Sequence, residues 1–196
     1  MRFSIAASLI GLAVFHGSAA VANNGDAALW QALKQGGHVV LIRHASTVPG
    51  TGDPPGFVLD NCATQRNLSD RGRAEAKQIG NTFRERGVPI GAVLSSRWCR
   101  CLDTARLAFD KAQPWAALDS HFDNPSNGAT QTAATLKDLA KHEGKDSNLV
   151  LVTHQVNITA LTGVYPAQGE AVIAKRVGKE LRVLGRLNPI EAGSSR

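Results

Sequence analysis

Two short apolar runs that end in polar side chains constrain the fold of this chain most strongly. The run VVLI, residues 39–42, is followed directly by Arg43 and His44, and the run LVLV, residues 149–152, is followed within two residues by His154. Neither run alternates between apolar and polar residues. Both are therefore typical of strands that are buried on both faces, as in a parallel sheet.

The rest of the chain alternates between helix-like and strand-like segments. The further predicted elements are a helix over 68–87, a strand over 92–96, a helix over 97–109, a helix over 130–142, and two edge strands over 170–177 and 180–187 that meet at Gly178. Buried strands separated by helices predict an α/β three-layer sandwich, with a mainly parallel central sheet and helices on both faces.

The helix over 68–87 carries clear signals at both ends. Ser69 is a plausible N-cap, and Gly87 is a plausible stop. Gly72 and Gly80 lie inside this helix, where each costs about 1 kcal/mol relative to alanine. Glycine at such a cost indicates that another segment packs close to the helix backbone at both positions.

The first 22 residues are typical of a signal peptide. Arg2 precedes an apolar run over 3–15, and the small residues Ala20-Val21-Ala22 suit cleavage after Ala22. We expect residues 23–196 to form a single domain that is periplasmic or secreted. An uncleaved interfacial anchor is the alternative. No later segment reaches about 18 apolar residues, so stable membrane insertion is not expected.

The net charge of +6 at pH 7 favours an anionic substrate or an acidic partner. The basic residues form no block of five or six like charges, so a nucleic-acid surface is not expected. Three cysteines, Cys62, Cys99 and Cys101, allow one disulfide in an oxidising compartment. Since Cys99 and Cys101 are too close for an easy bridge, Cys62 is expected to pair with one of them if it forms a disulfide at all.

Parallel strands bring their carboxyl ends to one rim of the sheet, where ligands bind in such folds. That rim should hold His44, His154, Arg43 and Arg100. A guanidinium group matches phosphate oxygens and repels a divalent cation, so an anion fits this set better than a metal does. With arginines lowering its pKa, His44 would be neutral and could act as a nucleophile towards phosphorus.

Four segments resemble the motifs of the histidine phosphatase superfamily. They are LIRHAST, NLSDRGRAEA, SSRWCRCLDTA and LVTHQ, which occur in family order between residues 41 and 155. Two positions depart from the pattern, because Ala45 and Gln155 stand where the family usually has glycine. The resemblance implies a phosphoglycerate mutase-like fold and a phosphatase of phosphate monoesters, which the predicted signal peptide would export.

The resemblance also implies roles for the rim residues. His44 would be transiently phosphorylated, and Arg43, Arg100 and His154 would form the phosphate pocket. The family uses no metal or other cofactor. The partner would then be a phosphorylated small molecule or glycan.

A general acid is implied as well, usually a glutamate from a segment after the Arg100 helix. The segment ALDSHFDNPSNG contains no glutamate. We favour Asp123, which lies at the opening of a loop, with Asp119 and His121 as alternatives.

The family pattern places Cys101 at a small buried position after the arginine. It therefore favours Cys99 as the partner of Cys62.

The long loop over 46–67, with Gln65 and Arg66, is expected to roof the pocket and to select the leaving group. A cell-envelope sugar phosphate is the substrate class that exported relatives suggest, with general phosphate-monoester scavenging as its competitor. The alternative function is a noncatalytic phosphate- or glycan-binding module that retains the phosphate pocket.

Overall fold

A six-stranded mixed sheet forms the centre of the structure, a computed structural model in which residues 20–192 are described. The strands lie in the order β3-β2-β4-β1-β5-β6. They are β1 Val39–Arg43, β2 Ile90–Ser95, β3 Gln113–Pro114, β4 Asn148–Thr153, β5 Ala171–Val177 and β6 Glu180–Leu187. The α-helices are α1 Ala20–Lys34, α2 Asp70–Glu85, α3 Cys99–Phe109, α4 Gly128–Asp138, α5 Gln155–Thr162 and α6 Pro189–Ala192.

The sheet combines a parallel part and an antiparallel part. Strands β1 to β4 are parallel to their neighbours in this group, and β5 and β6 are antiparallel. The predicted α/β sandwich is therefore confirmed. The prediction of two edge strands is wrong for β5, which lies between β1 and β6. Residues 171–174 of β5 are apolar and buried, and these residues let it pair on both sides in the interior.

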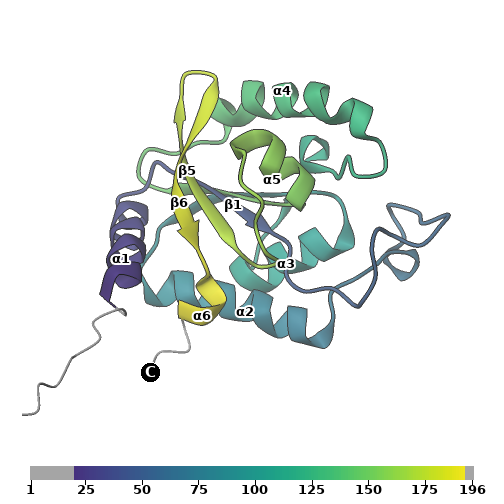
Figure 1. Cartoon of the computed structure of the whole chain (residues 1–196), viewed down its shortest axis with the longest axis horizontal. Helices are drawn as coiled ribbons and strands as arrows, with labels where there is room; N and C mark the ends of the chain where they lie inside the picture. Colours follow the sequence, from purple (N-terminus) through teal and green to yellow (C-terminus); the bar gives the residue numbers. More distant parts are fainter. Residues whose placement is uncertain (1–19, 193–196) are drawn as a thin grey trace, which may run out of the picture.

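Helices cover both faces of the sheet, as the unbroken apolar runs predicted. In β1, Val40 and Ile42 pack in a core with side chains of α1, α2 and α3. The alternate residues, Val39 and Leu41, pack in a second core with side chains of α5. Figure 1 shows α4 on one side of the sheet and α2 on the other.

Both predicted close approaches to the helix over 68–87 are confirmed. The side chain of Ser69 caps α2 by accepting a hydrogen bond from the backbone N–H of Gly72. A Cβ atom on Gly72 would lie 1.8 Å from the carbonyl oxygen of Ser46, and one on Gly80 would lie 1.9 Å from that of Ala108. Glycine thus lets α2 pack against the segment after β1 and against the backbone of α3.

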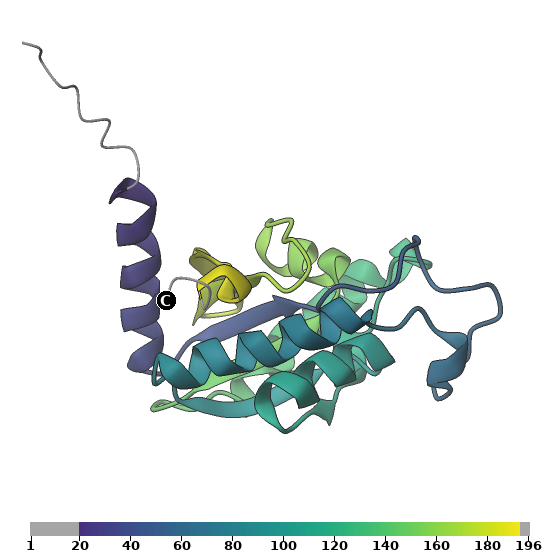
Figure 2. The ribbon, with the colours of Figure 1, turned by 90° about the horizontal axis from the view of Figure 1, so that it is seen from below.

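Three α-helices, α1, α5 and the short α6, were not predicted. Trp30 and Leu33 of α1 are buried in the core, although the helix lies at one end of the sheet (Figure 2). Most of the predicted signal peptide falls outside the described residues, and its cleavage point after Ala22 falls within α1. Between residues 20 and 192, no helix has the length and apolar character needed to cross a membrane.

Candidate active site

The carboxyl ends of β1, β2 and β4 meet at one rim of the sheet, as predicted for parallel strands. Arg43 pairs with Thr153, and Ser95 pairs with Val152 one residue earlier. A cavity of about 570 Å³ opens at this rim. The predicted residues that line it are Arg43, His44, Arg66, Arg100, Asp123 and His154.

His44 is held in one tautomer. Its side chain is buried, and Nδ1 lies 2.9 Å from the carbonyl oxygen of Ala45. Because a carbonyl oxygen only accepts hydrogen bonds, Nδ1 carries the proton and Nε2 keeps its lone pair. Burial, followed by the positive charge of Arg100, lowers the pKa of His44 to about 3. The imidazole is therefore neutral near pH 7.

Three arginines line the cavity around His44. Arg43 donates from Nη1 to the carbonyl oxygen of Pro166 at 2.9 Å, and Arg66 enters the cavity from the long loop. Arg100 is almost fully buried. Within the described part of the chain, Nε of Arg43 and Nε of Arg100 are buried donors with no acceptor. The cavity is thus built for an anion.

Asp53 is a carboxylate in the same cavity that the sequence analysis did not single out. Arg100 donates from Nη1 to both of its oxygens, at 2.8 and 3.0 Å. Trp98 donates from Nε1 at 2.9 Å, and the backbone N–H of Arg66 donates at 2.9 Å. Burial by itself would raise the pKa of Asp53, but the hydrogen bonds from Arg100 and Arg66 hold it below its usual value.

The rings of His154 and His44 contact each other edge to face at the cavity, with their centroids 5.5 Å apart. Its Nε2 lies 2.9 Å from Oγ of Ser96, and its Nδ1 lies 3.5 Å from Nη2 of Arg100. Since a guanidinium group only donates, Nδ1 is the lone-pair nitrogen and Nε2–H donates to Ser96. Burial and then Arg100 hold the pKa of His154 well below its usual value.

The three candidate general acids have different surroundings. Asp123 is exposed and lines the cavity. The carboxylate of Asp119 is buried and accepts hydrogen bonds from the backbone N–H and from Nε of Arg97. His121 is not among the lining residues, and its ring packs against Gly128. Of the three, Asp123 alone lines the cavity.

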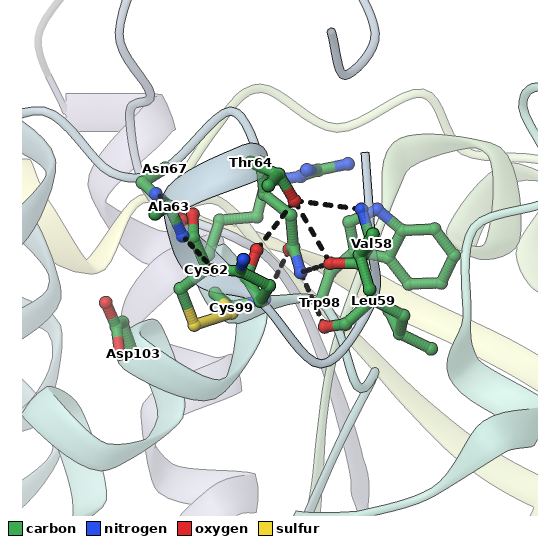
Figure 3. Close-up of a disulfide and its surroundings, with 12 residues drawn as sticks. Val58, Leu59, Cys62, Ala63, Thr64, Asn67, Trp98, Cys99 and Asp103 are labelled. Carbon is green, nitrogen blue, oxygen red and sulfur yellow. Dashed lines mark hydrogen bonds between the residues drawn. A yellow bond between two sulfur atoms is a disulfide. The ribbon is translucent and has the colours of Figure 1, made fainter. Parts of the chain in front are cut away.

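The long loop between β1 and α2 is tied to α3 beside the cavity. A disulfide joins Cys62 to Cys99, so the favoured pairing is confirmed (Figure 3). Cys101 is a buried free thiol, and burial raises its pKa to about 12. The expected role of Gln65 in the cavity is wrong, because its Oε1 accepts from the backbone N–H of Cys99 and holds the start of α3.

Exposed aromatic side chains stand beside the charged part of the cavity. Phe122 is 50% exposed and Tyr165 is 65% exposed, and both line the cavity. The sequence gives no sign of their role, because both residues lie outside any periodic element, where apolar residues give no burial signal. Within residues 20–192, no group of three or more His, Cys, Asp or Glu side chains is arranged as metal ligands.

Residues 39–132 match the family model of the histidine phosphatase superfamily (branch 1). The match contains His44 and Arg100 but ends before His154. No curated protein sequence matches the chain.

The solved structures with a similar fold include the following three phosphatases. The alpha-ribazole phosphatase from Shigella flexneri is 18% identical with a TM-score of 0.53, covering 74% of this chain and 95% of that one. The protein histidine phosphatase SixA complexed with tungstate is 16% identical with a TM-score of 0.53, covering 79% and 98%. A mutant phosphoserine phosphatase from Entamoeba histolytica with phosphoserine is 13% identical with a TM-score of 0.53, also covering 79% and 98%. At these identities the likeness concerns the fold.

Proposed function

We propose that this chain, whose family match and fold support the histidine phosphatase superfamily, is a phosphatase that hydrolyses phosphate monoesters through a phosphohistidine. One observation carries the proposal. Nδ1 of His44 donates to the carbonyl oxygen of Ala45, so the lone pair of Nε2 is available in a cavity lined by three arginines. A neutral imidazole beside fixed cations suits nucleophilic attack on a phosphoryl group.

The reaction proceeds in two displacements at phosphorus. First, the lone pair of Nε2 of His44 forms a bond to phosphorus while the bond to the leaving oxygen breaks. The leaving oxygen keeps that electron pair and takes a proton from Asp123. A water oxygen then bonds to phosphorus, one water proton returns to Asp123, and the electrons of the phosphorus–nitrogen bond return to Nε2.

Positive donors would stabilise the charge on the transferred phosphoryl group. A charge-assisted hydrogen bond contributes about 1.5–3 kcal/mol, and both Arg43 and Arg100 have buried Nε donors without an acceptor in the described chain. Burial and then the positive charge of Arg100 hold the pKa of His154 well below its usual value, and a phosphate dianion would offset the second of these effects. His154 lines the same cavity and would contact the bound phosphoryl group.

We propose that the substrate is a sugar phosphate of the cell envelope. We also propose that the enzyme is exported and so reaches this substrate. Phe122 and Tyr165 provide exposed rings at the cavity, and Ser120, Gln155 and Gln168 add polar groups that suit hydroxyls. The predicted signal peptide supports export. A disulfide is also typical of an oxidising compartment, which supports a periplasmic or secreted protein.

Phosphoryl trapping tests the nucleophile. The protein is mixed with an aryl phosphate, with chelator present, and acid-labile protein-bound phosphate is measured. We expect His44→Ala to lose both turnover and the trapped phosphate while melting as a folded protein.

His142→Ala is the matched control, because His142 packs against Trp115 and does not line the cavity. Full activity in His44→Ala would disprove the assignment. A wild-type protein that binds inorganic phosphate but neither turns over nor traps phosphate would instead be a noncatalytic binding module. Rates on sugar phosphates and on simple phosphate esters then test the substrate class.

A further inference from the structure

The most unexpected group in the cavity is a carboxylate where an anion should bind. The side chain of Asp53 is only 3% exposed. Its two oxygens accept hydrogen bonds from Arg100, Trp98 and the backbone of Arg66. Asp53 lies in the loop over 46–67, outside the four segments that resemble the family motifs.

The backbone around Asp53 is held in place by the loop itself. Arg66 donates from Nε to the carbonyl oxygen of Gly52 at 2.8 Å and from Nη1 to that of Gly50 at 2.9 Å. The same Nη1 donates to Oγ1 of Thr47 at 2.7 Å. The disulfide fastens the far part of the loop to α3. Asp53 is thus a fixed part of the cavity wall.

We propose that Asp53 is the positioning residue of Arg100 in the phosphate site, an inference that rests on the proposed function. Asp53 occupies Nη1 of Arg100, and Nη2 of the same guanidinium group points to His154 at 3.5 Å. Because Asp53 holds Nη1 of Arg100 against the loop, Nη2 stays at the cavity. Without this carboxylate, the guanidinium group would lose its only anionic hydrogen-bond partner among the described residues.

A competing role would give the opposite effect. If the carboxylate merely competed with phosphate for Arg100, removing its negative charge would raise the affinity for an anion. If Asp53 positions Arg100, removing it lets the guanidinium group move and weakens anion binding. Asparagine separates the two roles. It removes the charge and keeps one oxygen for Arg100, but its NH2 group cannot accept from the remaining donors.

The experiment measures the affinity of inorganic phosphate by titration calorimetry and the kinetics with an aryl phosphate. Asp53→Ala and Asp53→Asn are compared with the wild type. Asp60→Asn serves as the matched control, because Asp60 is an exposed aspartate of the same loop outside the cavity. We expect Asp53→Ala to weaken phosphate binding and lower kcat/KM by about 10- to 100-fold, with Asp53→Asn between it and the wild type.

The order of affinities decides the proposal. Tighter or unchanged phosphate binding in both variants would overturn it. If Asp53→Ala does not fold, Asp53→Asn decides alone, since weaker binding supports positioning and equal or tighter binding refutes it. The calorimetric arm needs no turnover. Suppose that the wild type shows no turnover but that phosphate affinity still decreases from the wild type to Asp53→Asn to Asp53→Ala. That result would contradict the proposed function but would support the positioning role of Asp53.

Discussion

Replacing Gly80 with alanine should destabilise the fold, because α2 and α3 touch through their backbones there. A Cβ atom at Gly80 would lie 1.9 Å from the carbonyl oxygen of Ala108 and 2.7 Å from its carbonyl carbon. Carbon and oxygen ordinarily approach to about 3.3–3.6 Å, so the two helices would have to separate by roughly 1.5 Å.

The expected loss follows from two opposing effects. Overpacking costs about 1–3 kcal/mol, and the upper part of that range applies because the obstacle is backbone rather than a flexible side chain. Alanine returns about 1 kcal/mol of helix propensity. The net loss should therefore be about 2 kcal/mol, which lowers the Tm of a chain of this length by about 4–8 °C.

Gly25→Ala is the matched control. Gly25 also lies in a helix, but a Cβ atom there would have nothing within 4 Å. Thermal and urea unfolding are measured for both variants with the disulfide intact. We expect Gly25→Ala to melt at or slightly above the wild-type temperature. If Gly80→Ala did the same, the reasoning about backbone contact between α2 and α3 would be refuted.

Three further outcomes are expected. Because His44 and His154 stay neutral well below their usual pKa of 6.5, the unfolded chain binds more protons below that pH. The free energy of unfolding should then fall as the pH drops from 6.5 towards the pKa of about 3 of His44. Each histidine contributes up to about 1.4 kcal/mol per pH unit, and a slope unchanged in His44→Ala would contradict this. Replacing both Cys62 and Cys99 with serine removes a link between residues 37 positions apart and should lower the free energy of unfolding, measured in urea, by about 3–4 kcal/mol. Equal stability of this variant and the wild type would contradict a stabilising role of the disulfide. Asp123→Asn should slow hydrolysis of alkyl phosphates much more than that of aryl phosphates with good leaving groups, and an equal loss across leaving groups would exclude it as the general acid.

Local sequence signals were sufficient to predict several of the strands and helices that position the site residues. The unbroken apolar run before Arg43 predicted a strand with both faces buried, and Ser69 predicted the start of α2. Both signals are local, because strand periodicity and helix capping depend on residues a few positions apart. The helix α5 escaped prediction, since it begins at Gln155 directly after a buried strand and has little polar–apolar asymmetry to mark it.

The sequence by itself determined that His44, Arg43, Arg100 and His154 would gather at one place. Each follows a predicted strand or opens the helix after one, and parallel strands end at the same rim of the sheet. Only the tertiary structure decided that Asp53 would form an ion pair with Arg100. Loops have no periodicity, and where they return to the core depends on long-range contacts such as the disulfide. That is the physical reason why these four residues of the cavity could be predicted from the sequence and the carboxylate that accepts hydrogen bonds from Arg100 could not.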